Sequence, residues 1–235
     1  MYGETCASKG PVIELFAPIQ RRQRYASRGS RNGACPKARM IYTATISSTP
    51  LRLRESRIVA DLLLQGVDEA AWKDAVVEQN VLQVDSPIGV IRSANILRAR
   101  LKPLGEGLWK MVRDGDREVA TQAALGGAIK HSRLLGDFMD LAIREQRALF
   151  AKKLEPRMWT DYIAGCRGRD PEMPHWSDST LNKLRSIVFS ILAEADYLSD
   201  TRSLTLQNVF VDLALANYLR DRNELYVLRC LEVME

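Results

Sequence analysis

Apolar residues recur every three or four positions along most of the chain from Leu51 onward, the spacing that places them on one face of an α-helix. The pattern predicts helices over residues 54–65, 69–79, 87–102, 106–112, 116–150, 156–164, 179–198 and 213–219, followed by an apolar tail over 225–233. The long segment contains glycines that predict a break near Gly126-Gly127 or Gly136. The predicted fold is therefore mainly α, a helical bundle without internal repeats.

Residue types at the ends of these segments support the helix boundaries. Asp68 and Ser86 directly precede two predicted helices, and their side-chain oxygens can accept the free N–H groups of a first turn. Pro87 is tolerated in a first turn, because that position needs no N–H donor. Three short helices with tight connections over residues 54–102 have the outline of a helix-turn-helix unit, an outline that many helical bundles share.

The same periodicity predicts which side chains face the core. In the helix over 87–102 we expect an inward stripe of Ile88, Ile91, Ile96, Leu97 and Leu101. In the helix over 179–198, which Ser177 or Asp178 would cap, we expect Leu181, Leu184, Ile187, Val188, Ile191 and Leu192 to face inward. Three tryptophans are expected to fill core positions between helices: Trp109, Trp159 and Trp176.

The composition along the chain predicts three regions. Residues 1–39 are rich in Arg, Ser and Gly and lack periodicity, so we expect a disordered basic leader, or an upstream extension if translation begins at Met40. Residues 40–150 form a predicted helical domain that contains the helix-turn-helix-like unit. Residues 151–235 form a predicted C-terminal helical domain, in which the segment around Leu204 to Leu206 can be a strand or the wing of a small winged-helix-like part.

Net charge separates the leader from the rest of the chain. The whole sequence has a formal charge of +5, but residues 1–39 contain eight basic and two acidic side chains, a net of +6. The remaining residues therefore have a net charge of −1. Because the high isoelectric point belongs to the leader, nucleic-acid binding by the folded part requires a local basic patch.

Outside the leader, the largest local surplus of basic residues lies over 92–113, which contains six basic residues and one acidic residue, Glu106. Lysine and arginine side chains can neutralise DNA phosphates, so we predict a DNA-binding surface at Arg92, Arg98, Arg100, Lys102, Lys110 and Arg113. At the start of a later predicted helix, N–H groups and basic side chains could meet a phosphate at Thr180, Lys183 and Arg185. The alternative for both sets is a solvated helix face with ordinary surface charges.

Residues that carry catalysis or bind metals are scarce. His131 has no acid or cysteine at coupling distance in the sequence, and His175 has Asp178 nearby but no nucleophile. The four cysteines follow no metal-binding spacing, and phosphate-loop, dinucleotide and hydrolase motifs are absent. We therefore expect no catalytic residues, no metal, no cofactor and no small-molecule substrate.

No apolar run approaches the roughly 20 residues that span a bilayer. The most apolar stretch, Ile187 to Leu198, is broken by Ser190, Glu194 and Asp196. The leader has no compact apolar region after a basic start, which a secretory signal would need. We expect a cytoplasmic protein without membrane contact, whose cysteines Cys166 and Cys230 are reduced thiols.

Four segments together resemble a known family over about residues 41–200. They are YTATISSTPLRLRESRIVADLLLQG (42–66), VEQNVLQVDSP (77–87), ATQAALGGAIKHSRLLGDFM (120–139) and WSDSTLNKLRSIVFSILAEADYL (176–198). In this order they are similar to BrxA, the accessory protein family of BREX bacteriophage-defence systems. The final 35 residues match this family weakly.

The resemblance implies a mostly helical, non-catalytic protein that binds DNA. It also implies a gene beside those for a methyltransferase, an ATPase and a phosphatase-like protein, and a part in phage restriction and host methylation. Members have been described as inner-membrane proteins, which the hydropathy of this sequence contradicts, and have been likened to the NusB fold. The resemblance supplies no residue-level motif for DNA contact, so the site residues above rest on charge placement.

The sequence thus favours an accessory protein that binds duplex DNA through phosphate contacts, beside other BREX proteins. The leading alternative is an adaptor that assembles BREX components without touching DNA, which the near-neutral charge of the body supports. NusB-like RNA binding is a further alternative.

Overall fold

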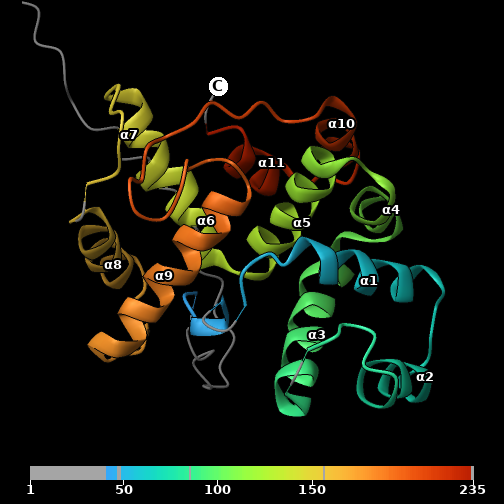
Figure 1. Ribbon diagram of the computed structural model, residues 1–235. Helices are drawn as coiled ribbons and strands as arrows, with labels where there is room; N and C mark the ends of the chain where they lie inside the picture. Colours follow the sequence, from blue (N-terminus) through green and yellow to red (C-terminus); the bar gives the residue numbers. More distant parts are fainter. Residues whose placement is uncertain (1–40, 47–48, 85, 156, 234–235) are drawn as a thin grey trace, which may run out of the picture. The chain divides into compact units, whose positions relative to one another are not determined.

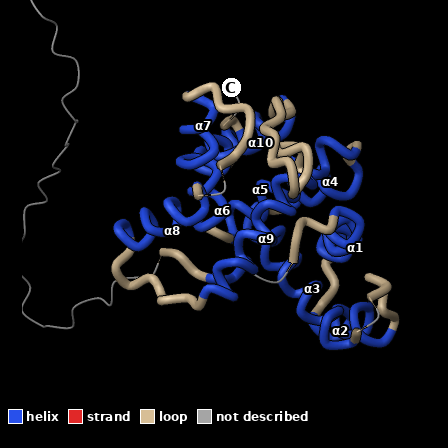
Figure 2. Tube along the Cα trace, turned by 60° about the vertical axis from the view of Figure 1, so that its left-hand side comes forward, coloured by secondary structure: helices blue, strands red, loops and turns tan. Residues whose placement is uncertain are grey.

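Helices dominate the computed structural model, which describes residues 41–46, 49–84, 86–155 and 157–233 (Figure 1). The described chain contains no strand, as Figure 2 shows. Two isolated antiparallel bridges, Lys153 with Thr205 and Leu198 with Leu206, lie where a strand was expected. The mainly α prediction is confirmed. The leader over 1–39, with its two cysteines, and Met40 lie outside the described residues.

The first half of the chain is a series of short helices. After a 3-10 turn, η1, they follow the predicted order: η1 (Ala44–Ile46), α1 (Leu53–Leu64), α2 (Glu69–Lys73), the π-helical η2 (Asp74–Glu78), α3 (Pro87–Leu101), the 3-10 turn η3 (Lys102–Leu104) and α4 (Glu106–Asp114). The caps are those expected from the sequence. The Asp68 carboxylate accepts the N–H of Ala71 at 2.8 Å, and the Ser86 hydroxyl accepts the N–H of Gly89 at 3.3 Å.

The second half contains one nearly continuous helical stretch and then separate helices. Its elements are α5 (Arg117–His131), α6 (Arg133–Asp137), the π-helical η4 (Phe138–Ile143), α7 (Arg144–Ala148), α8 (Met158–Arg169), α9 (Asp178–Glu194), α10 (Leu213–Asp221) and α11 (Leu225–Leu231). The predicted end of the helix over 156–164 was wrong, because α8 continues to Arg169. Asp170 follows it, and its carboxylate accepts the N–H groups of Ile41 and Tyr42 at 2.8 and 3.0 Å.

Helix α5 lies at the centre of the described fold, in contact with α1, α3, α4, α10 and α11 (Figure 1). Every residue from Ala120 to Ile129 is buried. The helix is rich in alanine and glycine rather than amphipathic, and small side chains allow neighbouring helices to approach it from all sides. The core is therefore built around a helix without a solvent face over these residues.

Neither predicted position of the break was right, because α5 runs through Gly126 and Gly127 and α6 runs through Gly136. A Cβ atom at Gly127 would lie 2.9 Å from the carbonyl oxygen of Arg100, so glycine allows the close approach of α3 here. The helix ends at His131 instead, and the Ser132 hydroxyl caps α6 by accepting the N–H of Leu135 at 3.4 Å.

The predicted inward stripe of α3 was partly wrong. Ile88 is 74% exposed and Ile91 is 41% exposed. Leu97 and Leu101 are buried as predicted, and Ile96 is half-buried. The other buried apolar residues of α3 are Val90 and Ala94, because this side of the helix packs against α1, η2 and α5. In α9, Leu184, Val188, Ile191 and Leu192 are buried as predicted, whereas Leu181 and Ile187 are half-buried. Among the tryptophans, Trp159 is buried, and Trp109 and Trp176 are half-buried.

Contacts group Ala38–Glu235 into one unit. Helices α10 and α11 pack against α4 and α5, and the Tyr218 hydroxyl donates to the carbonyl of Leu104 at 2.6 Å. The division of this unit into 40–150 and 151–235 stays a prediction. No helix of the described residues combines the length and the hydropathy that crossing a membrane requires.

Candidate nucleic-acid interface

The outward face of α3 and the first residue of η3 form a continuous surface, here named the α3 face. At 100° per residue, its exposed residues fall within an arc of about 100°. They are Ile88, Ile91, Arg92, Asn95, Ala99 and Lys102. This surface combines two cations, one side-chain amide and three apolar side chains, and it contains no carboxylate.

Arg92 and Lys102 are the two predicted site residues that the structure places together on the α3 face. Both are exposed, and no ion pair of either is present among the described residues. Sequence reasoning missed Asn95 and Ala99, which lie between them. The spacing 92, 95, 99 and 102 follows a helical stripe and could have identified these residues, had the buried side of α3 been predicted correctly.

Arg98 is half-buried and lies at the edge of the α3 face, about 20° around the helix axis from Ile91. Its guanidinium carbon is 4.4 Å from the centroid of the Trp72 ring, and Nη1 is 2.8 Å from Oε2 of Glu69. A cation above an aromatic face is attracted by the ring quadrupole. Arg98 therefore connects α3 to α2, and its charge is shared with a carboxylate.

Arg100 is buried, with 2% of its surface exposed. Its guanidinium donates to the carbonyl oxygens of Pro50 at 2.7 Å and Thr49 at 2.5 Å. Burial lowers the pKa of Arg100 to about 10, and Glu194 opposes this effect. In this position Arg100 holds the segment before α1 against α3 and does not reach a surface that DNA could contact.

The predicted basic residues of α4 are exposed or half-exposed but paired. Lys110 lies 2.8 Å from Glu106 one turn earlier, and this contact lowers the pKa of Glu106. Arg113 lies 3.1 Å from Asp61 of α1 and 2.7 Å from Asp114, both of which raise its pKa. The carboxylates of Glu106, Asp61 and Asp114 therefore neutralise the positive charges of Lys110 and Arg113.

The predicted residues of α9 belong to a separate element (Figure 1). The N–H of Thr180 already donates to the Ser177 hydroxyl at 3.3 Å. Lys183 is exposed, and the guanidinium of Arg185 is 5.6 Å from the Phe189 ring centroid. A groove of about 390 Å³ between α8 and α9 includes Arg185 and also Asp178 in its lining.

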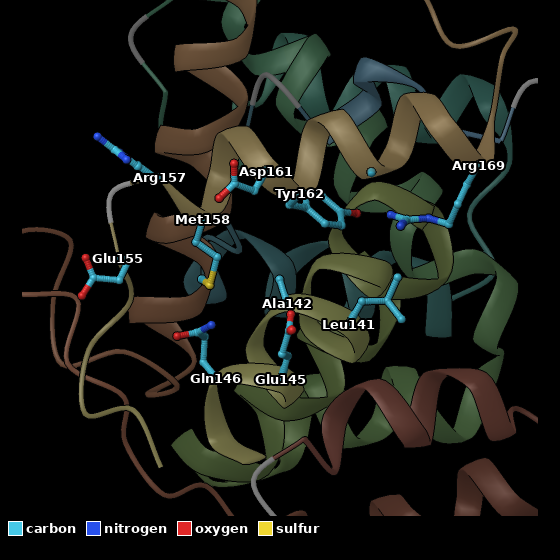
Figure 3. Close-up of a pocket in the computed structure, with 11 residues that line it drawn as sticks. Leu141, Ala142, Glu145, Gln146, Glu155, Arg157, Met158, Asp161, Tyr162 and Arg169 are labelled. Atoms are coloured by element: carbon cyan, nitrogen blue, oxygen red, sulfur yellow. The ribbon is translucent and has the colours of Figure 1, made fainter. Parts of the chain in front are cut away.

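A cavity of about 600 Å³ between α8 and the η4–α7 segment has an acidic lining (Figure 3). Three carboxylates, Glu145, Glu155 and Asp161, and two guanidiniums, Arg157 and Arg169, line it, so acidic side chains are in excess. Carboxylates repel phosphates, so this cavity does not fit a nucleic acid.

The histidines and cysteines are not arranged for catalysis in the described part of the chain. His131 is half-buried and His175 is exposed, and no cluster of three metal-binding side chains occurs among the described residues. Cys166 and Cys230 are buried free thiols, as predicted. Burial raises the pKa of Cys230 to about 12, which keeps this thiol protonated at neutral pH.

Comparisons with known proteins agree on one family. The family model described as BrxA matches residues 40–223. A relative named BREX protein BrxA from Paramagnetospirillum magneticum (strain ATCC 700264 / AMB-1) is 47% identical over 192 residues, 82% of this chain and 96% of the relative. Another of the same name from Escherichia coli O9:H4 (strain HS) is 32% identical over 162 residues, 69% of this chain and 76% of the relative.

A solved structure is also similar. It is described as the crystal structure of an uncharacterized protein from Magnetospirillum magneticum, and it aligns with a TM-score of 0.77 at 46% sequence identity. The alignment covers 82% of this chain and 99% of the solved one.

Proposed function

The chain belongs to the BrxA family of BREX proteins, and from this premise we propose that it is a non-catalytic accessory protein of a BREX phage-defence system that binds duplex DNA. Its binding would support phage restriction and host methylation beside other BREX components. The observation that carries the proposal is the α3 face, where Arg92, Asn95 and Lys102 are exposed without a neighbouring carboxylate on the same surface.

Phosphate contacts supply most of the affinity in this mechanism. Arg92 and Lys102 lie ten residues apart along α3 and η3, roughly 15 Å at the helical rise, so they can reach different phosphates of one duplex. The helix-turn-helix arrangement would place α3 in the major groove, with α2 and η2 beside it. The contacts of η2 and α1 with α3 support the proposal that these helices act together as a helix-turn-helix unit.

The C-terminal part would contribute secondary contacts. Lys183 at the start of α9 is exposed and can meet a phosphate. The segment over 204–206, held by its two antiparallel bridges, is the part that would serve as a wing. Arg98, Lys110 and Arg113 would act less directly, because each already contacts a carboxylate.

A protein-docking adaptor is the second candidate, and the exposure of Ile88 and Ile91 favours it. Two large aliphatic side chains, one turn apart on a helix face, suit a partner protein as well as the methyl groups of thymine. The ion pairs of Arg98, Lys110 and Arg113 reduce the free positive charge available to DNA. In this case the α3 face would bind another BREX protein.

Fluorescence anisotropy with a labelled duplex, at about 50 and 200 mM salt, tests DNA binding. The double variant Arg92→Gln and Lys102→Gln should weaken binding and lower the salt slope by roughly 1.8, for two lost phosphate contacts. The double variant Arg117→Gln and Arg157→Gln removes the same charge from exposed positions outside the α3 face, α2 and the 204–206 segment, and it is the control. Each protein is measured as the full chain and from Met40, because a leader with net charge +6 binds DNA by itself.

The measurement separates the alternatives. Equal affinity of the two double variants, in the chain that begins at Met40, would contradict a DNA site on the α3 face. Loss of BREX partners in a pull-down with Ile88→Ser and Ile91→Ser, at unchanged DNA affinity, would support the adaptor. Stronger competition by single-stranded RNA than by duplex DNA would indicate NusB-like RNA binding.

A further inference from the structure

Phe150 has an unusual combination of exposure and backbone conformation. Its side chain is 91% exposed, and its φ angle is 55°, in the left-handed region. The N–H of Phe150 donates to the carbonyl of Arg147, and the N–H of Ala151 donates to that of Gln146, both at 2.9 Å. These bonds close the C-terminus of α7 in the pattern that normally has glycine at the left-handed position.

Phenylalanine at this position is unfavourable for folding on two grounds. A bulky residue with positive φ is strained. An aromatic ring that stays exposed to water adds almost no hydrophobic stabilisation to compensate for this strain. Strained residues that do not contribute to packing occur at ligand sites more than elsewhere. The question is therefore what the Phe150 ring contacts.

A cavity of about 670 Å³ lies beside the ring, here named the Phe150 cavity. Its lining includes the basic side chains of Arg144, Arg147 and Lys152 and the amides of Gln207 and Asn208, and no carboxylate side chain. It is thus the reverse of the acidic cavity between α8 and the η4–α7 segment.

Two of the cations are held in place. Arg144 donates to the carbonyl of Arg229 at 2.5 Å and lies 3.3 Å from Asp140. Arg147 donates to the Asn208 side chain across the cavity. The buried Asp140 carboxylate is shared by Arg144 and Arg229, so the surroundings of the cavity keep a net positive charge. Lys152, the third cation of the lining, is exposed.

We propose that the Phe150 cavity binds an unpaired nucleotide of a single-stranded nucleic acid. The base would stack on the Phe150 ring, and the phosphates would lie at Arg147 and Lys152. An aromatic platform beside a basic groove is the arrangement that single-strand binding needs, because every base has a stacking face and every linkage has a charge. Arg147 and Lys152 both line the cavity, so it can hold more than one phosphate, which favours a strand over a free nucleotide.

The inference goes beyond duplex binding by the α3 face, because it concerns another element and another form of nucleic acid. The two sites can be disabled separately. Phe150→Ala should leave duplex affinity unchanged, whereas the Arg92→Gln and Lys102→Gln variant should lower it. Failure of one proposal therefore does not imply failure of the other.

The test measures the full chain and the chain from Met40, because the +6 leader binds nucleic acid by itself, by fluorescence anisotropy with a labelled oligothymidylate strand. A strand of the same length with abasic sites has the same charge and no bases, so it isolates stacking. Phe150→Ala should weaken thymidylate binding by about 10-fold or more and abasic-strand binding by less than about 2-fold. Phe210→Ala is the matched control, because Phe210 is 71% exposed and lies outside the Phe150 cavity.

Charge variants complete the test. Arg147→Gln and Lys152→Gln should weaken binding of both strands, whereas Arg202→Gln, an exposed position elsewhere, should not. Circular dichroism checks that each variant is folded. Unchanged thymidylate affinity in folded Phe150→Ala would overturn the proposal, as would an equal loss for the abasic strand. Displacement of the strand by thymidine monophosphate at equal nucleotide concentration would also overturn it, in favour of a free-nucleotide site.

Discussion

The guanidinium of Arg100 donates a hydrogen bond of 2.7 Å to the main-chain carbonyl of Pro50, a residue 50 positions earlier. This contact, with a second one to Thr49, fixes the segment that leads into α1 against the middle of the fold. Arg100 lies in the most basic segment outside the leader, yet its side chain is buried and bonds to main-chain carbonyl groups. The number of basic residues in a segment of the sequence is thus larger than the number of positive charges on its surface.

The first prediction concerns this contact. Arg100→Met should lower the free energy of unfolding by roughly 2 kcal/mol or more, because two largely buried carbonyl groups lose their donor. Urea denaturation measures the change. Arg92→Met removes the same charge from an exposed position and should change stability by about 0.5 kcal/mol at most. Similar losses in the two variants would contradict the structural role of Arg100.

A second prediction concerns the buried carboxylate of Asp137. It accepts hydrogen bonds from the hydroxyls of Tyr42 and Tyr226, each at 2.7 Å, and lies 2.9 Å from Arg133. Asp137→Ala should cost about 3 kcal/mol or more, since it leaves buried partners unsatisfied. Tyr42→Phe should cost about 1 kcal/mol, because only one bond is lost. Thermal or urea unfolding of both variants compares the two losses, and equal losses would show that the carboxylate does not organise the cluster.

The contact between Arg98 and Trp72 leads to a third prediction. Arg98→Ala should lower the free energy of unfolding by about 1 kcal/mol, through loss of the cation–π contact and of packing by the side-chain stem. Glu69→Ala should change it by less than about 0.5 kcal/mol, because the Glu69 side chain is largely exposed. If Glu69→Ala proved the more harmful in urea unfolding, the ion pair rather than the aromatic ring would hold Arg98.

A fourth prediction concerns pH. Burial lowers the pKa of His131 below 6.5, and the charge of Arg100 acts in the same direction. Nδ1 of His131 is buried without a hydrogen-bond partner among the described residues. The folded state therefore favours neutral histidine, and stability should fall as pH decreases from about 6.5 toward the lowered pKa.

Urea midpoints at about pH 7.5 and pH 5.5 measure this dependence. His131→Gln should reduce the difference between the two midpoints. Burial of Glu194 raises the pKa of its carboxyl, which acts in the opposite direction near its own titration, so the comparison with the variant isolates the histidine. An unchanged difference in His131→Gln would assign the pH dependence to other groups.

The strain at Phe150 gives a fifth prediction, on stability alone. Phe150→Gly should raise the free energy of unfolding by about 1 kcal/mol, because glycine adopts the left-handed conformation without a steric cost and the exposed ring contributes little packing. Phe150→Ala keeps a Cβ atom and should not show this gain. Thermal unfolding compares the two variants, and a loss of stability in Phe150→Gly would show that the ring packs in solution.

By itself, the sequence determined the order of the helices, several of their starts and the scarcity of catalytic side chains. Helix starts at Asp68, Ser86 and Ser177 were predictable because a cap bonds to an N–H group two or three residues away. The relation to one family was also visible in the order of its motifs. These properties depend on neighbours within a turn or on residue identity, so no tertiary information was needed.

Only the tertiary structure decided which side of a helix is buried and which charges are free. The isoleucines and valines of α3 allowed more than one phase, and packing against α1, η2 and α5 chose the phase that exposes Ile88 and Ile91. Arg92 and Arg100 are both arginines of α3. The Arg100 guanidinium donates to carbonyl groups about 50 residues away, whereas the Arg92 side chain is exposed to solvent. Local periodicity carries no information about such distant partners, and these partners determine which cations remain available to a ligand.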